Sequence, residues 1–299
     1  FFLRLRLPPR STLFPYTTLF RSPRFFPGGK LRVRDDVRAG TAGGAARRAP
    51  GMRIGHITDL HLRNALPGSA SPDTTLRSRD VPELLARALD AMKRNHVEFV
   101  AVTGDVVDVP LYVVEPTFFN YYDFRVEDFL PEVEADYRRV RDILRDAGIP
   151  YMILPGNHDH EPTFWKVFEK DAHVDDRFKG FRFVRFADRE WAFFVPQRVD
   201  RERLLMERTL AGSDARVQVH LQHFVIEPPI EHWYPHNYLE REHLSRTLSA
   251  NGNVRLALSG HAHWEIDPVV VNGMSLIHAF KVADVALTIL SFKIYPYFV

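Results

Sequence analysis

The chain has 299 residues, of which 45% are hydrophobic, 26% charged and 12% aromatic. This composition fits one large or two small domains with a packed core, and it excludes disordered and collagen-like proteins. The absence of cysteine excludes a disulfide framework, a thiolate zinc site and a cysteine nucleophile. Because no apolar run reaches the roughly 18 residues of a membrane span, we expect a cytoplasmic protein.

The net charge of +2 combines two segments of opposite sign. Residues 1–51 contain 11 Lys+Arg and 2 Asp+Glu, whereas residues 52–299 contain 29 and 36. The first segment shows no helical or strand periodicity, and arginines interrupt every apolar stretch that a signal peptide would need. Its residues 11–22 resemble a translated sequencing-adapter artefact. We expect a disordered, non-native leader over residues 1–51 and one domain over residues 52–299. The alternative is a basic arm that binds nucleic acid or a membrane surface.

From Met52 onward, apolar runs alternate with amphipathic segments, a pattern typical of a layered α/β domain. Helices are predicted where apolar residues recur at helical spacing, and strands where short apolar runs are bounded by turn residues. In chain order, the predicted elements are a strand at 53–58, a helix at 82–95, a strand at 97–103, a helix at 132–147, a strand at 150–154, two strands within 181–195, a helix at 201–210, a strand at 217–221, a helix at 238–249, and strands at 254–258, 268–271, 276–280 and 285–292.

Clusters of Asp, Asn and His follow five of these strands at the point where each strand ends. Ligands gather at the carboxyl ends of strands in open α/β sheets, so these clusters are expected to converge in space. Carboxylate and imidazole donors without thiolate suit Mn, Fe, Zn or Co, and they suit catalytic sites rather than closed structural ones. The clusters are Asp59-Leu-His61, Gly104-Asp105-Val-Val-Asp108, Gly156-Asn-His-Asp159, His223 and Gly260-His-Ala-His263.

The individual motifs differ in their specificity. Asp-x-His and Gly-Asp-x-x-Asp are weak signals, because a loop aspartate often caps a helix or begins a turn. His-x-His is stronger, since alternate residues share one face of a strand. Gly-Asn-His-Asp is the most specific of the four. Their joint occurrence, each after a strand, favours a metal site over chance.

The ordered set from Asp59 to His263 resembles the calcineurin-like metallophosphoesterases. The resemblance implies a four-layer α/β/β/α sandwich of two mixed sheets flanked by helices. It also implies a phosphoester hydrolase that works through a dinuclear centre of divalent ions and a bridging hydroxide. Carried over by position, the first metal would be bound by Asp59, His61 and His263, the second by Asn157, His223 and His261, and both by Asp105. His158 would protonate or stabilise the leaving group, Asp159 would orient the ring of His158, and Asp108 would hold its loop.

The fourth motif departs from the His-His-Pro of many phosphodiesterase-like members, because the sequence here is Gln222-His-Phe-Val225. Two histidines therefore compete for this ligand position. His223 falls at the strand end, whereas His220 lies an odd number of positions earlier and should face the other side of the strand. We therefore prefer His223.

The resemblance leaves the substrate open. We expect small phosphodiesters such as cyclic nucleotides, with phosphomonoesters and nucleic acids as alternatives. The acidic balance of residues 52–299 disfavours a nuclease, since it does not attract a polyanion. A non-catalytic scaffold is the rival from another class, but every motif position is filled. Residues 112–129 and 231–236 are candidates for substrate walls, and packing loops are the alternative.

Overall fold

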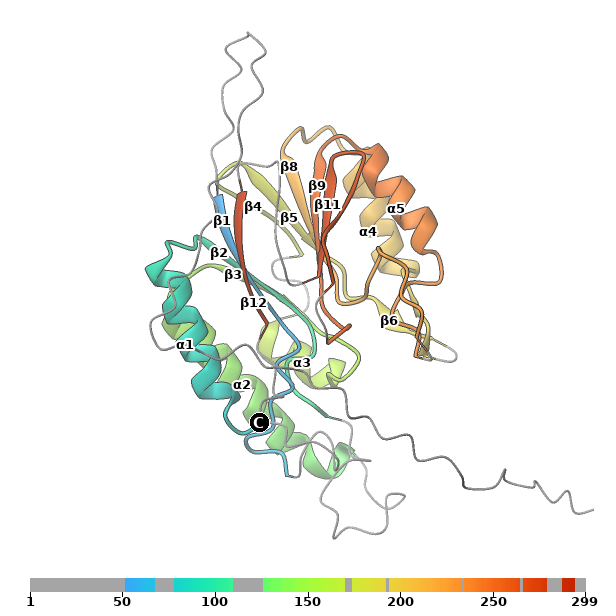
Figure 1. Ribbon diagram of the computed structural model, residues 1–299. Coiled ribbons are helices and arrows are strands. Elements are labelled where there is room, and N and C mark those ends of the chain that lie inside the picture. Colours follow the sequence, from blue (N-terminus) through green and yellow to red (C-terminus); the bar gives the residue numbers. More distant parts are fainter. Residues whose placement is uncertain are drawn as a thin grey trace, which may run out of the picture. The chain divides into compact units, whose positions relative to one another are not determined.

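The computed structural model describes residues 52–67, 78–109, 126–169, 174–191, 194–232, 234–263, 266–278 and 287–293. The chain divides into two units, residues 1–41 and 42–299, and every described residue belongs to the second. In this unit two β-sheets face each other, and helices cover the outer face of each (Figure 1). The expected four-layer α/β/β/α sandwich is confirmed. The leader at residues 1–51 lies outside the described residues and stays a prediction.

The first sheet is parallel in all its described pairings. Parallel neighbours require long crossovers, which α1 and α2 provide on one face. Alternate residues of the central strand β2 point to opposite faces, so Phe99 and Ala101 contact the second sheet while Val100 and Val102 contact the helices. The order is β12 (Leu287–Lys293), β1 (Met52–Thr58), β2 (Phe99–Thr103) and β3 (Tyr151–Leu154), with α1 (Val81–Arg94), η2 (Val126–Phe129), α2 (Leu130–Ala147) and α3 (Glu161–Phe168).

The second sheet is mixed, because its inner pairings are parallel and its two outer pairings antiparallel. Helices α4 and α5 cover its outer face (Figure 1). A separate two-stranded hairpin, β6–β7, lies beyond β5 in the chain. The order is β10 (Val269–Val271), β11 (Met274–His278), β9 (Val254–Ser259), β8 (Val217–Leu221), β5 (Phe181–Arg185) and β4 (Asp175–Phe178), with β6 (Arg189–Glu190), β7 (Pro196–Gln197), α4 (Asp200–Ala211) and α5 (Arg241–Ala250).

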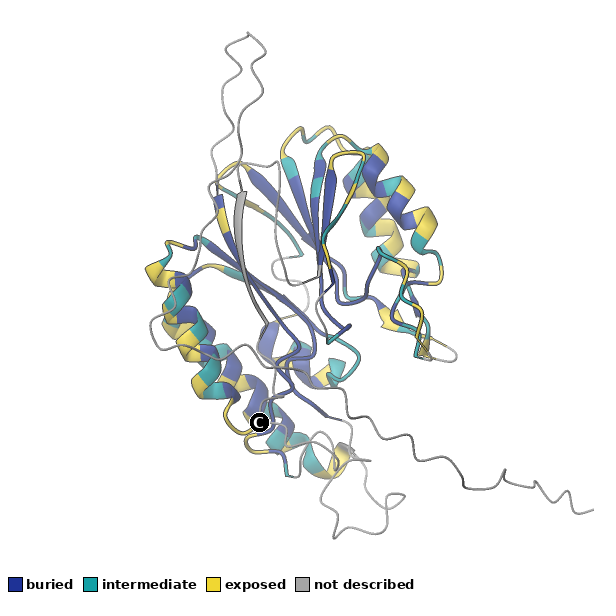
Figure 2. Cartoon of the chain, viewed as in Figure 1, coloured by how far each residue is buried: buried dark blue, intermediate teal, exposed yellow. Residues whose placement is uncertain are grey.

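Three clusters of buried apolar residues hold the four layers together. Figure 2 shows the buried residues in dark blue on the strands and on the helix faces that pack against them. The central cluster lies between the sheets, where Phe99 stacks on Phe183 with ring centroids 4.0 Å apart. The two outer clusters join each sheet to its helices. This packing brings the carboxyl ends of β1, β2 and β3 towards those of β8 and β9, and thereby positions the site.

Four elements were missed by the sequence patterns, namely η2, α3, β4 and β7. Helix α3 has only two turns, which is too short for the helical spacing of Phe164, Val167 and Phe168 to repeat. Strand β4 reads Asp-Asp-Arg-Phe and lies at a sheet edge, so it contains no apolar run. The second strand expected within 181–195 is the two-residue β6, which pairs with β7 rather than with β5. None of the described helices has both the length and the apolar character needed to cross a membrane.

Candidate metal centre

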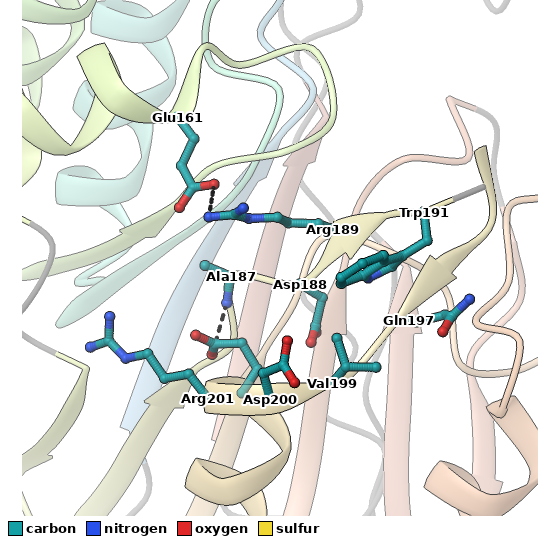
Figure 3. A pocket seen from close by; sticks show the side chains of 10 residues that line it. Glu161, Ala187, Asp188, Arg189, Trp191, Gln197, Val199, Asp200 and Arg201 are labelled. Atoms are coloured by element: carbon teal, nitrogen blue, oxygen red, sulfur yellow. Dashed lines mark hydrogen bonds and ion pairs between the residues drawn. The ribbon is translucent and has the colours of Figure 1, made fainter. Parts of the chain in front are cut away.

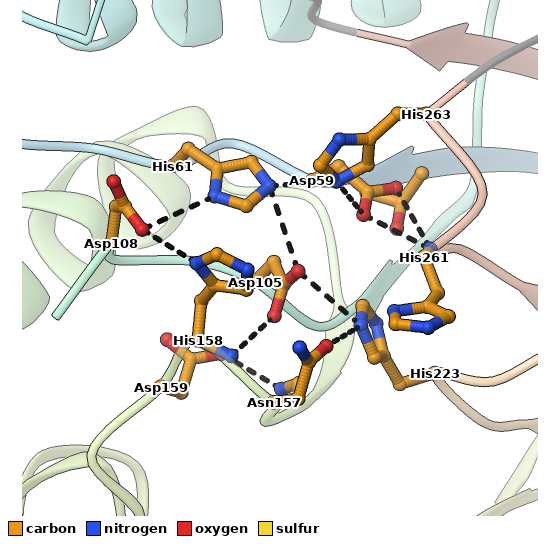
Figure 4. A network of polar contacts seen from close by, with 12 residues as sticks. Asp59, His61, Asp105, Asp108, Asn157, His158, Asp159, His223, His261 and His263 are labelled. Atoms are coloured by element: carbon orange, nitrogen blue, oxygen red, sulfur yellow. Dashed lines mark hydrogen bonds and ion pairs between the residues drawn. The ribbon is translucent and has the colours of Figure 1, made fainter. Parts of the chain in front are cut away.

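The sequence-predicted site residues come together where the strands of both sheets end (Figure 4). Because the contributing strands are parallel, their carboxyl ends lie at the same edge. Five of the site residues have positive φ, between 45° and 72°, although none is glycine. Such strained backbone is concentrated at functional sites, since the surroundings must hold it in place. These five are Asp59, His61, Asp105, His261 and His263.

The first group of candidate ligands comprises Asp59, His61, Asp105 and His263. One donor atom from each lies within 4.8 Å of the others. His263 Nε2 is 2.9 Å from His61 Nε2 and 3.3 Å from Asp59 Oδ1. Three of the four residues are buried, and His263 is partly exposed. This convergence of nitrogen and oxygen donors matches the set expected for the first metal.

A second group comprises Asp105, His223 and His261, whose donor atoms also lie within 4.8 Å of one another. The Oδ2 atom of Asp105 is 3.4 Å from His223 Nε2 and 3.5 Å from His61 Nε2. Figure 4 shows this carboxylate between the two imidazoles. Asn157 joins the group, because its Oδ1 is 3.0 Å from His223 Nε2. Asp105 therefore belongs to both groups.

The protein groups alone do not satisfy this site. Asp105 Oδ2 and His261 Nε2 are buried and have no hydrogen-bond partner among the described residues. A buried polar atom without a partner costs about 1–3 kcal/mol, and a divalent cation would give both atoms a partner. The donor set and these two atoms fit metal ions.

The electrostatics of the site also favour cations. Burial alone would raise the pKa of Asp105, but His223 and His158 hold it well below its usual range. Burial would lower the pKa of His223, but the negative charge of Asp105 raises it to about 9. The Asp105 carboxylate thus remains ionised and favours the protonated form of His223, whereas burial lowers the pKa of His61 and of His261. Metal binding at His223 would release its proton.

His158 lies beside the two groups, and Asp108 holds its ring. Asp108 Oδ1 is 2.6 Å from His158 Nδ1, and Asp108 Oδ2 is 3.3 Å from the buried Arg63 Nε. Burial lowers the pKa of His158, but Asp105 and Asp108 raise it to about 9. We expected Asp159 to orient this ring, but Asp108 makes the contact instead. The sequence feature that singles out Asp108 is its place in the motif Gly-Asp-x-x-Asp.

Asp159 binds backbone rather than the His158 ring. Its carboxylate accepts hydrogen bonds from the N–H groups of Gly156 (2.8 Å), Val106 (3.1 Å) and Val107 (2.9 Å), and from Tyr137 Oη (3.0 Å). Its short side chain folds back onto the turn that carries it, and so it cannot also reach the ring. Burial and the neighbouring Asp105 raise its pKa to about 7. Asp159 therefore ties the loops after β2 and β3 together.

His220 lies within β8, whereas His223 follows the end of this strand, and the two rings have different surroundings. His220 is fully buried, contacts Gln218 Oε1 at 3.0 Å, and its ring centroid is 5.2 Å from that of Phe186. Burial, with the charges of two nearby arginines, lowers its pKa to about 3. His223 Nδ1 instead contacts the Thr103 carbonyl at 2.8 Å, which turns Nε2 towards Asp105.

We expect His223→Ala to bind less than two equivalents of metal, because it removes a donor from the second group. His220→Ala is the matched control, since it also removes a buried imidazole and leaves the donors in place. Metal content after dialysis, measured by atomic spectroscopy, separates the two variants. A His223→Ala protein with full metal content would refute the assignment of His223.

Gly104→Ala is expected to disturb the site as well as the fold. Gly104 has a φ of +94°, and a Cβ there would lie 2.4 Å from His223 Nδ1 and 2.8 Å from Gly156 N. The matched control is Gly148→Ala, at a φ of +68° with no atom within 4 Å of the added Cβ. Both variants should lose about 1–2 kcal/mol of unfolding free energy from left-handed strain, and Gly104→Ala more. Calorimetric titration with Mn²⁺ should show weaker binding for Gly104→Ala alone; equal affinities would contradict this.

The two candidate substrate walls have different outcomes. Residues 112–125 lie outside the described residues. Of the segment 231–236, Tyr234 and His236 lie beside the second group of candidate ligands, because their rings are 5.6 and 4.9 Å from that of His261. Tyr234 also donates a hydrogen bond to Glu190 of β6. No sequence signal pointed to Glu190.

A pocket of about 210 Å³ lies apart from these groups, between the β6–β7 hairpin and the start of α4 (Figure 3). None of the predicted site residues lines it. Arg189 and Glu161 form an ion pair at its edge (2.6 Å), and Glu202 accepts a hydrogen bond from the Ala187 N–H (3.1 Å). Because these charged groups are already paired, we do not place the metal centre there.

Comparisons with known proteins point the same way. A model of the calcineurin-like phosphoesterase family matches residues 52–265. The chain is 21% identical to a probable cyclic nucleotide phosphodiesterase from Psychrobacter arcticus, over 72% of this chain and 74% of that protein. It is 25% identical to the DNA double-strand break repair protein Mre11 from Sulfurisphaera tokodaii, over 39% of this chain but only 24% of Mre11. A dimetal phosphatase from Danio rerio has a similar fold, with a TM-score of 0.52 at 14% identity over 77% of this chain and 87% of that one.

Proposed function

Because the chain belongs to the calcineurin-like phosphoesterase family, a family of phosphoester hydrolases, we propose that it hydrolyses small phosphodiesters such as cyclic nucleotides at a dinuclear metal centre. The observation that carries this proposal is the position of Asp105 in both groups of donor atoms. A carboxylate shared in this way can bridge two ions, and paired ions are the usual arrangement for phosphoryl displacement. The ions would be Mn, Fe, Zn or Co, as the donor chemistry suggests.

The proposed ligands follow the two groups. Asp59, His61 and His263 would hold one ion, and Asn157, His223 and His261 the other, with Asp105 between them. When bound, the ions supply positive charge to the phosphoryl oxygens and lower the pKa of water.

His158 is the proposed general acid. His158 forms a third group of possible metal donors with His61 and Asp108, but Asp108 holds its Nδ1, which leaves Nε2 for the substrate. A proton donated from this nitrogen to the departing oxygen would assist cleavage of the ester bond. Asp108 fixes the orientation of the ring, and Asp159 keeps the loop of His158 in place.

Two observations support a small phosphodiester as the substrate. The relative from Psychrobacter arcticus, which aligns over most of both chains, is described as a probable cyclic nucleotide phosphodiesterase. The acidic balance of residues 52–299 repels a long polyanion, so a nuclease is the weaker alternative. The match to Mre11 spans about a quarter of that protein and does not change this order. Phosphomonoesters and a non-catalytic scaffold remain the other candidates, and a cytoplasmic location stays a prediction.

A substrate panel tests the proposal. Metal-free protein is loaded with Mn²⁺, Fe²⁺, Zn²⁺ or Co²⁺ and assayed with a cyclic nucleotide, a bis-ester and a monoester of phosphate. We expect the cyclic diester to be hydrolysed fastest and a strong chelator to abolish turnover. Faster turnover of the monoester would support a phosphatase. Neither metal binding nor hydrolysis with any of the substrates would support the scaffold.

A further inference from the structure

Asn157 has a neighbour that none of the sequence motifs contains. Its Nδ2 is 3.4 Å from Tyr234 Oη, while its Oδ1 is 3.0 Å from His223 Nε2 on the other side. Tyr234 in turn donates its hydroxyl proton to Glu190 Oε1. A chain of contacts thus runs from the β6–β7 hairpin to a proposed metal ligand.

The protons in this chain allow one orientation of the Asn157 amide. A phenol hydroxyl has a single proton, and that of Tyr234 is donated in the hydrogen bond to Glu190. The Tyr234 oxygen can therefore only accept a hydrogen bond from Asn157. The amide nitrogen is the one end of the Asn157 side chain that has protons to donate. Nδ2 must therefore face Tyr234, and Oδ1 faces the donor atoms of the second group. With the opposite orientation, two acceptor oxygens would face each other and an N–H group would occupy the metal position.

The Tyr234 ring is itself held in place. It stacks on Phe194 with ring centroids 6.1 Å apart and an interplanar angle of 28°, and it lies 5.6 Å from the His261 ring. Glu190 is partly buried and belongs to β6, which pairs with β7. The hairpin thereby fixes the acceptor, and ring contacts fix the phenol between the acceptor and Asn157.

We propose that Tyr234, anchored by Glu190, is a positioning residue that keeps the Asn157 amide oxygen directed at the second metal position. This inference rests on the proposed function, because it assigns Asn157 as a ligand. Tyr234 acts through Asn157, and neither Tyr234 nor Glu190 needs to touch the metal or the substrate.

The test is the affinity of metal-free protein for Mn²⁺, measured by calorimetric titration. We expect wild-type protein to bind two equivalents, and Tyr234→Phe to bind one of them about 10–100-fold more weakly, as is typical when a hydrogen-bond partner of a ligand is removed. Glu190→Ala should have a similar effect, since the freed phenol proton can then be donated to Asn157 Oδ1. The double variant Tyr234→Phe/Glu190→Ala should bind Mn²⁺ no more weakly than either single variant, because both changes act through the Asn157 amide.

The Asn157→Asp background separates positioning from structural damage. A carboxylate presents an oxygen in either orientation, so Tyr234→Phe should no longer weaken Mn²⁺ binding there. The matched control is Tyr238→Phe, in which another tyrosine loses a hydrogen bond to a carboxylate, here Asp188 at 2.5 Å, in the buried cluster with Arg198. This control should lower the melting temperature and leave both Mn²⁺ affinities unchanged.

The possible results are distinct. If Tyr234→Phe keeps both Mn²⁺ affinities and raises only KM, Tyr234 contacts substrate. That result overturns this inference and leaves the proposed function intact. It is also overturned if the loss of affinity persists undiminished in the Asn157→Asp background. Wild-type protein that binds no Mn²⁺ would overturn the proposed function and this inference together.

Discussion

Asp105→Asn is expected to lower phosphoester hydrolysis by more than about 100-fold, since even the hydrogen-bond partners of metal ligands commonly contribute 10–100-fold. Asparagine matches the shape of aspartate but has no charge, and one of its two ends is an N–H group that cannot bind a cation. The effect is large because Asp105 belongs to both donor groups and faces His61 and His223 at once. Turnover of a chromogenic phosphodiester with Mn²⁺, together with the bound metal content, measures it.

The control for this variant is Asp142→Asn, the same change at a solvent-accessible position on α2. It should keep wild-type turnover and metal content. Circular dichroism should show that the Asp105→Asn protein is folded, so that the loss is chemical. Full turnover in Asp105→Asn, or in wild-type protein with excess chelator, would refute the metal-dependent mechanism.

His158→Ala is expected to show a loss that depends on the leaving group. General acid catalysis typically contributes about 10²–10⁴-fold, and this contribution is needed most when the departing alcohol is a poor leaving group. We therefore expect kcat to fall by that factor for an alkyl phosphodiester and far less for a nitrophenyl ester. KM should change little, because His158 acts on the departing oxygen.

Asp108→Asn should reproduce this dependence in a weaker form, since it leaves the His158 ring present but less firmly oriented. His243→Ala is the matched control, because His243 is an exposed histidine on α5. It should hydrolyse both esters at the wild-type rate. An equal loss for the alkyl and the nitrophenyl ester in His158→Ala would exclude His158 as the general acid.

Much of the fold was accessible from local patterns. The long helix α2 was expected at 132–147 and is observed at Leu130–Ala147, because it has enough turns for its buried stripe to repeat. Strand β2 was found from its apolar run, since both of its faces are covered. Helix α3 and strand β4 were missed because each is too short or too polar to carry a pattern of its own.

The site shows the same division. The strand-end motifs were enough to bring Asp59, Asp105 and His261 forward as candidates, because parallel strands place their carboxyl ends at one edge. The motifs did not reveal that Asp108, rather than Asp159, contacts the His158 ring. That contact depends on how two loops are folded, which the positions of the two aspartates along the chain do not determine.

The sequence by itself determined most of the strands and helices, the absence of thiolate ligands and the candidate nitrogen and oxygen donors. These are properties of residue type and of short segments, which interact mainly with their neighbours in the chain. The tertiary structure decided that Asp108 contacts the His158 ring, that Asp159 binds backbone N–H groups instead, and that Tyr234 contacts Glu190. Such contacts join residues far apart in the chain, as with His61 and His263 at 202 positions, and Glu190 and Tyr234 at 44. They depend on the packing of two sheets and their loops, which no local pattern records.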